Sequence, residues 1–232
     1  MQPILELSSV TKKYGAKLAL DEVSFKASPG RIIGLLGSNG SGKTTLMKIA
    51  SGLMQPASGV VRICGEPVGS QSKAMTAFMP DKPLTEPWMR VQDAISFFSD
   101  FYSDFDRDKA KEMVSFMQLN SREKISSLSK GMNERLQLTL TLSRNAKLYL
   151  LDEPIGGVDP VAREKILDAI VQYYNEESCL IVTTHLIHDI ERIFDEVAFI
   201  KSGKLIMHEE VDHIRMTYGK SVVDMFKEVY AE

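Results

Sequence analysis

A glycine-rich segment that ends in lysine and threonine carries the clearest chemistry in this sequence. It runs Gly37, Ser38, Asn39, Gly40, Ser41, Gly42, Lys43, Thr44, with Thr45 next. Glycines let the backbone turn its N–H groups toward phosphate oxygens, and a helix that begins here presents its positive end to them. Lys43 can then reach the terminal phosphates and the Thr44 hydroxyl a magnesium ion. The segment therefore predicts a nucleotide phosphate site.

A pair of carboxylates, Asp152 and Glu153, ends the apolar run 148–151. A hard cation between phosphates prefers oxygen ligands, and hydrolysis needs a base close to the terminal phosphate. Alone, such a pair is most often a solvated turn. Together with the phosphate loop it predicts a magnesium ligand in Asp152 and a water-activating base in Glu153. Both motifs together leave kinases, GTPases and motor proteins open.

Buried strands are needed to position these two motifs. Short runs rich in β-branched residues at 31–37, 147–151, 179–183 and 196–200 are typical of strands with both faces buried. Helical segments follow the first two, at 43–52 and 160–174, with Pro160 suited to a first helical turn. This alternation predicts an α/β fold around a parallel sheet.

The remaining segments predict additions to this core. Alternating residues near 4–10, 23–27 and 59–63 indicate a flanking antiparallel β subdomain, while residues 91–102 and 133–144 show helical spacing. A hairpin is expected around 201–204. We predict one domain divided into a nucleotide-binding core with its antiparallel β subdomain, 1–85 and 146–208, an inserted helical subdomain, 86–145, and a short C-terminal helical extension, 209–232.

Further motifs narrow the class, because residues 128–132 read Leu-Ser-Lys-Gly-Met and open a helix before Asp152. This string resembles the LSGGQ signature of the ATP-binding-cassette (ABC) proteins, a P-loop NTPase family, and the resemblance extends over roughly residues 4–207. Tyr14 is similar in position to the aromatic that stacks on adenine in that family. The loop that ends at Asp159 resembles its dimer-contacting loop, and His185 its γ-phosphate-sensing histidine.

The resemblance implies a head-to-tail dimer with ATP between two subunits. The phosphate loop of one subunit would face Ser129 and Gly131 of the other, where a hydroxyl, an N–H group and a helix end can complete an anion site. Lys43 and magnesium would offset developing charge. Glu153 would polarise the attacking water, and His185 would hold the γ-phosphate and that glutamate in register.

Three positions depart from the family pattern. Asp81 stands where the family usually has a glutamine, and it can accept but not donate hydrogen bonds. It could approach magnesium, directly or through water, or be only a turn residue after Pro80. The signature carries Lys130 and Met132 in place of a glycine and a glutamine. Lys130 could add a cation near the nucleotide in trans, although a lysine at a helix start is more often solvated.

Of three other segments, two have a functional interpretation beside a plainer one and the third has only the plainer one. Residues 82–89, which include Trp88, suit a groove that receives a short helix of a permease, or pack within the helical subdomain. The stretch 97–106 predicts an amphipathic helix and turn, with the core accounting for its Phe and Tyr residues. Residues 208–213 could be a metal cluster, but a solvated helix start is the stronger expectation.

Composition restricts the partners and the compartment. The 28 Lys and Arg against 31 Asp and Glu residues give a formal net charge of −3, so no global positive field favours nucleic acid. Cys64 and Cys179 suit free thiols in a reducing compartment. Neither a signal peptide nor an apolar run of about 20 residues is found. We expect a cytoplasmic protein that is peripheral on the inner face of the cell membrane.

The leading hypothesis is the ATP-hydrolysing subunit of a membrane transporter, working with ATP and Mg²⁺. It would join a separate integral-membrane permease, as a homodimer or as a heterodimer with a second ABC ATPase. The modified signature and short C-terminus resemble bacterial exporters of peptides, antibiotics or lipids. The alternative is a non-transport ABC ATPase in translation or DNA repair. A kinase or GTPase explains neither the signature nor His185, and the chain has no Asn-Lys-x-Asp tetrad.

Overall fold

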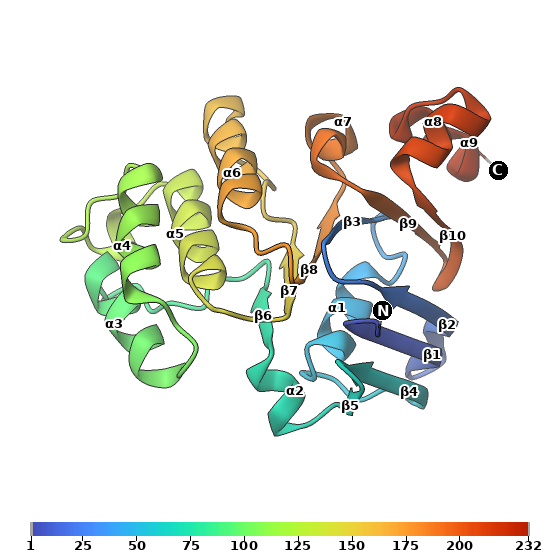
Figure 1. The fold of residues 1–232 in the computed structure, drawn as a ribbon, viewed down its shortest axis with the longest axis horizontal. Helices are drawn as coiled ribbons and strands as arrows, with labels where there is room; N and C mark the ends of the chain where they lie inside the picture. The colour runs from blue at the N-terminus through green and yellow to red at the C-terminus, as the bar shows by residue number, and fades with distance from the viewer. Residues whose placement is uncertain (1, 232) are drawn as a thin grey trace.

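A six-stranded sheet forms the centre of the protein in the computed structural model, which describes residues 2–231. Its strand order is β10-β9-β3-β8-β7-β6 (Figure 1). All neighbouring strands are parallel except β9 and β10, which form the predicted hairpin. The predicted parallel sheet is thus confirmed. Its strands are β3 (Arg31–Leu36), β6 (Thr76–Met79), β7 (Leu148–Asp152), β8 (Cys179–Thr184), β9 (Glu196–Lys201) and β10 (Lys204–Glu210).

Helices cover both faces of this sheet, because strands buried on two sides need apolar partners on each. On one face α1 (Lys43–Ala50) packs in the same apolar cluster as Ile33 of β3. On the other, α6 (Pro160–Tyr173) shares a cluster with Ile32. Alternate residues of β3 thus pack against the helices on the two faces of the sheet. The loop that follows this strand therefore begins at a rigid position.

A four-stranded antiparallel sheet, in the order β2-β1-β4-β5, flanks the α1 side. The hairpin of β1 and β2 is longer than predicted, since pairing continues to Tyr14 and Lys17 at its tip. Tyr14 therefore ends a strand. The elements here are β1 (Leu5–Tyr14), β2 (Lys17–Ala27), β4 (Ser58–Ile63), β5 (Glu66–Pro67) and the short helix α2 (Ser70–Ala74).

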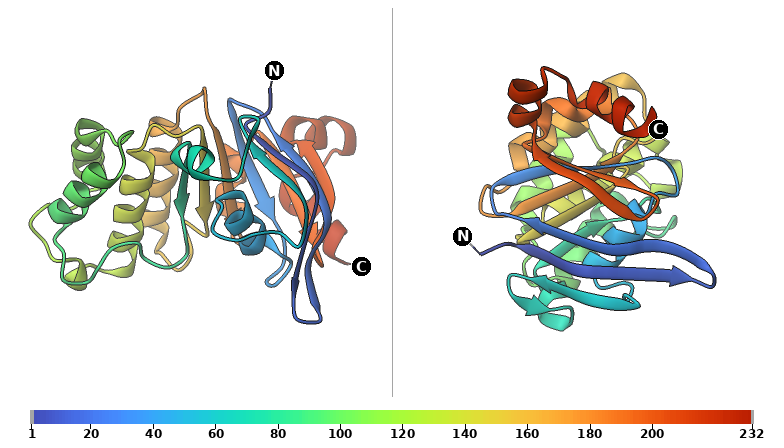
Figure 2. Two further views of the ribbon diagram at one scale, coloured as in Figure 1. Left: turned by 90° about the horizontal axis from the view of Figure 1, so that it is seen from below. Right: turned by 90° about the vertical axis from the view of Figure 1, so that its right-hand side faces the viewer.

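A group of helices lies at the end of the molecule opposite this antiparallel sheet (Figure 2). It comprises α3 (Val91–Phe101), α4 (Arg107–Phe116), a 3-10 turn (Ile125–Ser127) and α5 (Lys130–Leu142). The helices predicted near 91–102 and 133–144 are confirmed, with α5 beginning three residues earlier than its apolar spacing indicated.

The aromatic stretch 97–106 was only partly predicted. It forms the end of α3 and a turn, and Phe98 packs in the core at 5% exposure. Phe97 and Phe101, however, are 50% and 69% exposed and stack on each other. The expectation that the core accounts for these aromatics is therefore wrong for two of them, since they lie on the solvent face of α3.

The C-terminal part returns to the sheet edge and continues as two short helices, as predicted. These helices are α8 (Val211–Tyr218) and α9 (Val222–Ala231). Earlier in the chain, α7 (Ile187–Ile190) and a 3-10 turn (Glu191–Ile193) connect β8 to β9. His208 belongs to β10 and pairs with Glu196 at 2.7 Å, so the expected helix start at 208–213 is correct only from Val211. No helix within residues 2–231 has the length and apolar character that a membrane span requires.

Candidate nucleotide site

The phosphate loop connects β3 to α1, as its glycines predicted. Gly40 and Gly42 adopt positive φ values of 79° and 115°, which side chains disfavour. A Cβ at Gly42 would also lie 2.6 Å from the Ala19 carbonyl, so the loop passes tightly beneath β2. Gly37 and Ser41 are buried, whereas Ser38 and Asn39 are exposed. The Ser41 hydroxyl has no hydrogen-bond partner among the described residues.

Lys43 folds back into the loop at the start of α1. Its ammonium donates to the carbonyls of Gly37 at 2.7 Å and Ser38 at 3.2 Å. Burial lowers the Lys43 pKa, while Asp152 and Glu153 oppose that effect. A buried cation that is held only by carbonyl dipoles has a strong affinity for an anion, and phosphate oxygens meet that requirement.

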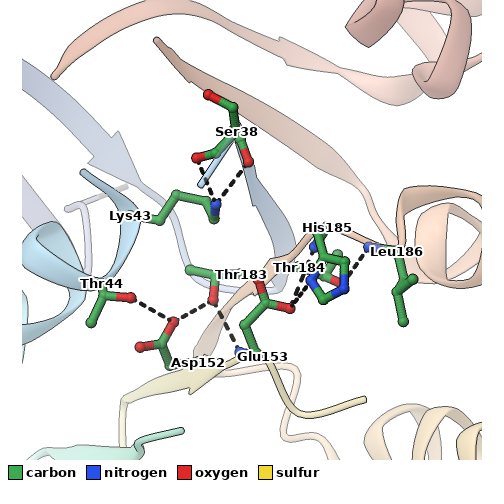
Figure 3. Close-up of polar contacts among 10 residues, drawn as sticks. Ser38, Lys43, Thr44, Asp152, Glu153, Thr183, Thr184, His185 and Leu186 are labelled. Atoms are coloured by element: carbon green, nitrogen blue, oxygen red, sulfur yellow. Dashed lines mark hydrogen bonds and ion pairs between the residues drawn. The ribbon is translucent and has the colours of Figure 1, made fainter. Parts of the chain in front are cut away.

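Asp152 lies at the centre of a set of oxygen groups (Figure 3). Its Oδ1 accepts a hydrogen bond from Thr183 Oγ1 at 2.6 Å and one from Thr44 Oγ1 at 3.3 Å. The carboxylate is only 2% exposed. A buried carboxylate beside the hydroxyl of the phosphate loop is a donor set that fits Mg²⁺, which prefers one or two carboxylates together with substrate phosphates.

Glu153 projects next to Asp152 and contacts His185. Its Oε2 lies 2.9 Å from His185 Nδ1 and 3.4 Å from the His185 backbone nitrogen. The backbone of Glu153 is left-handed, with φ 55°, and its N–H donates to Thr183 Oγ1 at 3.1 Å. Non-glycine residues in this region are strained, and such strain concentrates at functional sites. The geometry places a carboxylate and an imidazole together facing the phosphate loop.

These groups share one cavity of about 680 Å³. Of the predicted site residues, those that line it are Tyr14, Asn39, Gly40, Gly42, Lys43, Thr44, Thr45, Asp81, Asp152, Glu153 and His185. Tyr14 stands at its edge, 46% exposed, and its hydroxyl donates to Met54 Sδ at 3.0 Å. The fold thus brings together motifs that are widely separated in sequence.

Six predicted residues do not line this cavity. Gly37, Ser38 and Ser41 belong to the phosphate loop itself, and the other three lie at the starts of α5 and α6. Ser129 caps α5, where its Oγ accepts from the Met132 N–H at 3.2 Å. Asp159 caps α6 by accepting from the Ala162 N–H at 3.0 Å, and this backbone hydrogen bond lowers its pKa. Gly131 is buried, and a Cβ there would lie 3.6 Å from Val158. Within one subunit Ser129 and Asp159 therefore cap two helices, and Gly131 takes part in helix packing.

Two of the three departures from the family pattern, Asp81 and Lys130, lie at the cavity. Asp81 is exposed on its wall, and no hydrogen bond to it occurs within residues 2–231. Lys130 reaches the same cavity from the first position of α5, and a Cβ on Gly157 would lie 3.1 Å from its Cε. The Lys130 side chain therefore packs on the loop of its own chain that contains Gly157.

Thr183 is a site residue that the sequence analysis did not identify. It bonds to both acidic residues, and its position follows from the parallel register in which Asp152 lies opposite Thr183. The signal available in the sequence is the polar pair Thr183 and Thr184 at the end of an otherwise apolar strand.

A parallel sheet with a phosphate loop after β3 and acidic residues after β7 defines a P-loop NTPase. Residues 20–156 match the family model described as ABC transporter, so this chain belongs to the ABC transporter family. As a member it is an ATP-binding protein and an ATPase.

Several relatives and solved structures cover nearly the whole chain. A Nod factor export ATP-binding protein I of Cupriavidus metallidurans is 30% identical, over 97% of this chain and 78% of that protein. The uncharacterised ABC transporter ATP-binding protein YhcH of Bacillus subtilis is 32% identical, over 89% and 70%. The structure of an ATP-binding subunit of an ABC transporter superposes with a TM-score of 0.87 at 23% identity, over 97% and 99%. It establishes the fold.

Proposed function

We propose that this chain is the motor subunit of an ABC exporter, dimerising around ATP to drive a substrate through a separate permease. The contact between Glu153 and His185 beside the Lys43 loop is the observation that carries this proposal. It supplies a base and a group that orients it within reach of a terminal phosphate. The subunit would work at the cytoplasmic face of the membrane.

In this mechanism Lys43 exchanges its two carbonyl partners for phosphate oxygens. The Thr44 hydroxyl and Asp152 would hold Mg²⁺, with Asp81 as a further oxygen donor on the same wall. That ion supplies charge neutralisation on the transferred phosphoryl group. Glu153 polarises the attacking water, and His185 keeps the carboxylate aimed at it.

The dimer in this proposal explains the residues outside the cavity. Ser129, Gly131 and Asp159 lie at helix starts, where N–H groups and helix dipoles favour an anion. The solved structures that the fold matches include a dimeric bacterial ABC transporter cassette, with a TM-score of 0.77 at 22% identity. We propose that these residues face the nucleotide of a second copy, or of a related subunit.

Export and the permease contact are two further parts of the proposal. The relative quoted above is named for Nod factor export, which favours export for this chain too. Exposed Leu84 and Trp88, at 44% and 70%, belong to the segment that follows β6 and Asp81, and Asp81 lines the cavity. We propose that this segment receives a permease helix. A non-transport role in translation or DNA repair remains the second candidate, and the net charge of −3 speaks against nucleic acid.

The test is the molar mass of the Glu153→Gln protein in solution, with and without Mg-free ATP. We expect a monomer without nucleotide and a dimer with ATP, because binding is kept while hydrolysis stops. The matched control is Lys43→Ala in the Glu153→Gln background, which should bind ATP weakly and stay monomeric. A Glu153→Gln protein that turns over ATP at the wild-type rate would refute the assignment of the base.

A further inference from the structure

Helix α9 ends beside the strand that carries the phosphate loop. The Tyr230 hydroxyl donates to the Ile200 carbonyl at 2.6 Å and lies 3.5 Å from the carbonyl oxygen of Leu36. Leu36 is the last residue of β3 and directly precedes Gly37. One side chain near the end of the chain thus contacts the backbone where the loop begins.

The Ile200 carbonyl touches the loop itself. A Cβ added to Gly37 would lie 2.5 Å from this oxygen, so the first glycine of the loop packs directly against it. The carbonyl oxygen therefore contacts both the Tyr230 hydroxyl and the first glycine of the loop. A displacement of the Ile200 oxygen would therefore displace Gly37, the first residue of the phosphate loop.

This backbone needs an outside donor on its β3 side because the pairing with β3 stops here, while Ile200 stays paired with Leu205 of β10 on the other side. The parallel pairing of β3 with β9 ends with Leu36 opposite Phe199, where β3 turns into the loop. Buried carbonyls beyond the end of a ladder must find a donor elsewhere. Tyr230 provides it.

Neighbouring contacts fix the position of the tyrosine. Phe226 stacks on its ring at 4.2 Å between centroids, and the Lys201 ammonium donates to the Val229 carbonyl at 3.0 Å. Burial raises the pKa of Tyr230 to about 12, so its hydroxyl keeps the proton that it donates at neutral pH. The hydroxyl is therefore available as a hydrogen-bond donor at neutral pH.

We propose that Tyr230 is a positioning residue for the phosphate loop, holding the Ile200 carbonyl and the base of the loop in the shape that receives ATP. The inference rests on the proposed nucleotide site. Without the hydroxyl, ATP binding must itself order the base of the loop, which costs affinity. By reciprocity, bound ATP must stabilise helix α9.

The first experiment compares ATP affinity, kcat and thermal unfolding of the wild-type and Tyr230→Phe proteins. This change removes only the hydroxyl and keeps the stacked ring. We expect the Kd for ATP to rise roughly fivefold, as for the loss of one hydrogen bond, with kcat at saturating ATP nearly unchanged. A purely structural role would lower the melting temperature without changing the affinity.

Tyr173→Phe is the matched control. Its hydroxyl donates to Glu112 at 2.9 Å, between α6 and α4 and outside the nucleotide cavity. It should lose stability while keeping the wild-type Kd. Hydrogen exchange of the α9 amides gives a second measurement. ATP should slow it in the wild-type protein and slow it less in Tyr230→Phe.

The outcomes separate this inference from the function on which it rests. If the unaltered chain binds ATP and Tyr230→Phe binds it equally well, with α9 exchange insensitive to ATP, the inference is wrong and the proposed function stands. If the unaltered chain does not bind ATP, the proposed function fails and the inference fails with it.

Discussion

His185 Nδ1 lies 2.9 Å from Glu153 Oε2, and this contact joins two residues that directly follow neighbouring strands, β8 and β7. Glu153 is held from the other side by the bond of its N–H to Thr183. The Glu153 backbone is therefore tied to β8, and its carboxylate to the residue that directly follows β8. Rigid elements hold catalytic groups more accurately than loops do.

Replacing His185 by alanine should separate catalysis from binding. The carboxylate of Glu153 loses the partner that orients it, so kcat should fall on the order of a hundredfold or more, within the range for loss of a positioned acid–base group. ATP affinity of the single subunit should change little, because Lys43 and Thr44 remain. His188→Ala is the matched control, an exposed histidine three residues later that should keep the wild-type rate. Single-turnover kinetics give both quantities.

Two substitutions of Ser129 test its role toward a second subunit. Ser129→Ala removes the cap of α5 and should cost about 1 kcal/mol of stability. It should also weaken ATP-dependent dimer formation more than ATP binding to one subunit. Ser129→Asp keeps a capping acceptor but adds negative charge where a phosphate is expected. If Ser129→Asp dimerised with ATP as the wild type does, Ser129 would not face the nucleotide of its partner.

Lys130 should act on its own subunit, since its side chain lies across Gly157. Lys130→Met removes a cation from the cavity and should lower kcat several-fold. Gly157→Ala should have a similar effect because the new methyl group displaces the lysine. The double variant should be no slower than either single variant, and such non-additivity marks a shared contact.

A neighbouring glycine provides the control for that pair. A Cβ at Gly156 would meet the Glu153 carbonyl at 3.2 Å, with no lysine atom among its close contacts. The effects of Gly156→Ala and Lys130→Met on ln kcat should therefore add. Gly157→Ala also forces a side chain into φ 72°, at a cost of about 1–2 kcal/mol that thermal unfolding should detect in both backgrounds. Full additivity for Gly157 would show that the lysine contact has no effect on turnover.

Glu134 predicts a stability that depends on pH. Burial raises the pKa of Glu134 to about 7. The positive charge of Lys130 acts to lower this pKa, and the negative charge of Asp81 acts to raise it. The folded state then binds more protons than the unfolded state between pH 4.5 and 7, so the free energy of unfolding should fall as the pH rises through this window. The full difference corresponds to a loss of roughly 3 kcal/mol at most.

Urea unfolding at several pH values measures this contribution. Glu134→Gln should be relatively more stable than the wild type at pH 8 and lose that advantage at pH 4. Glu86→Gln is the control, because Glu86 is exposed and its change should leave the pH profile as it is. An unaltered profile in Glu134→Gln would place the titrating group elsewhere.

Local signals were sufficient for much of the fold. The glycine pattern 37–42 and the apolar runs before it and before Asp152 predicted the loop, the parallel sheet and the acidic pair, because strand, turn and helix preferences depend on neighbouring residues.

Helix α4 (Arg107–Phe116) was missed since it buries only Ala110, Met113 and Val114. Its capping residue Asp106, which accepts from two backbone N–H groups, was the signal available. The subdomain boundaries stay a prediction.

Contacts across the sheet could not be predicted in the same way. Thr183 lies opposite Asp152 because β7 and β8 are neighbours in the sheet. Lys130 lies against Gly157 because α5 packs against α6. Residue periodicity shows which face of a strand is buried but not which strand lies beside it.

The sequence by itself predicted the chemistry of this protein, because a phosphate loop and an acidic pair at a strand end are recognised by residue type and local order. The tertiary structure decided which groups hold those residues in place. Thr183 and Tyr230 contact partners at least 30 residues away in the chain, and only the folded sheet brings these atoms within hydrogen-bond distance.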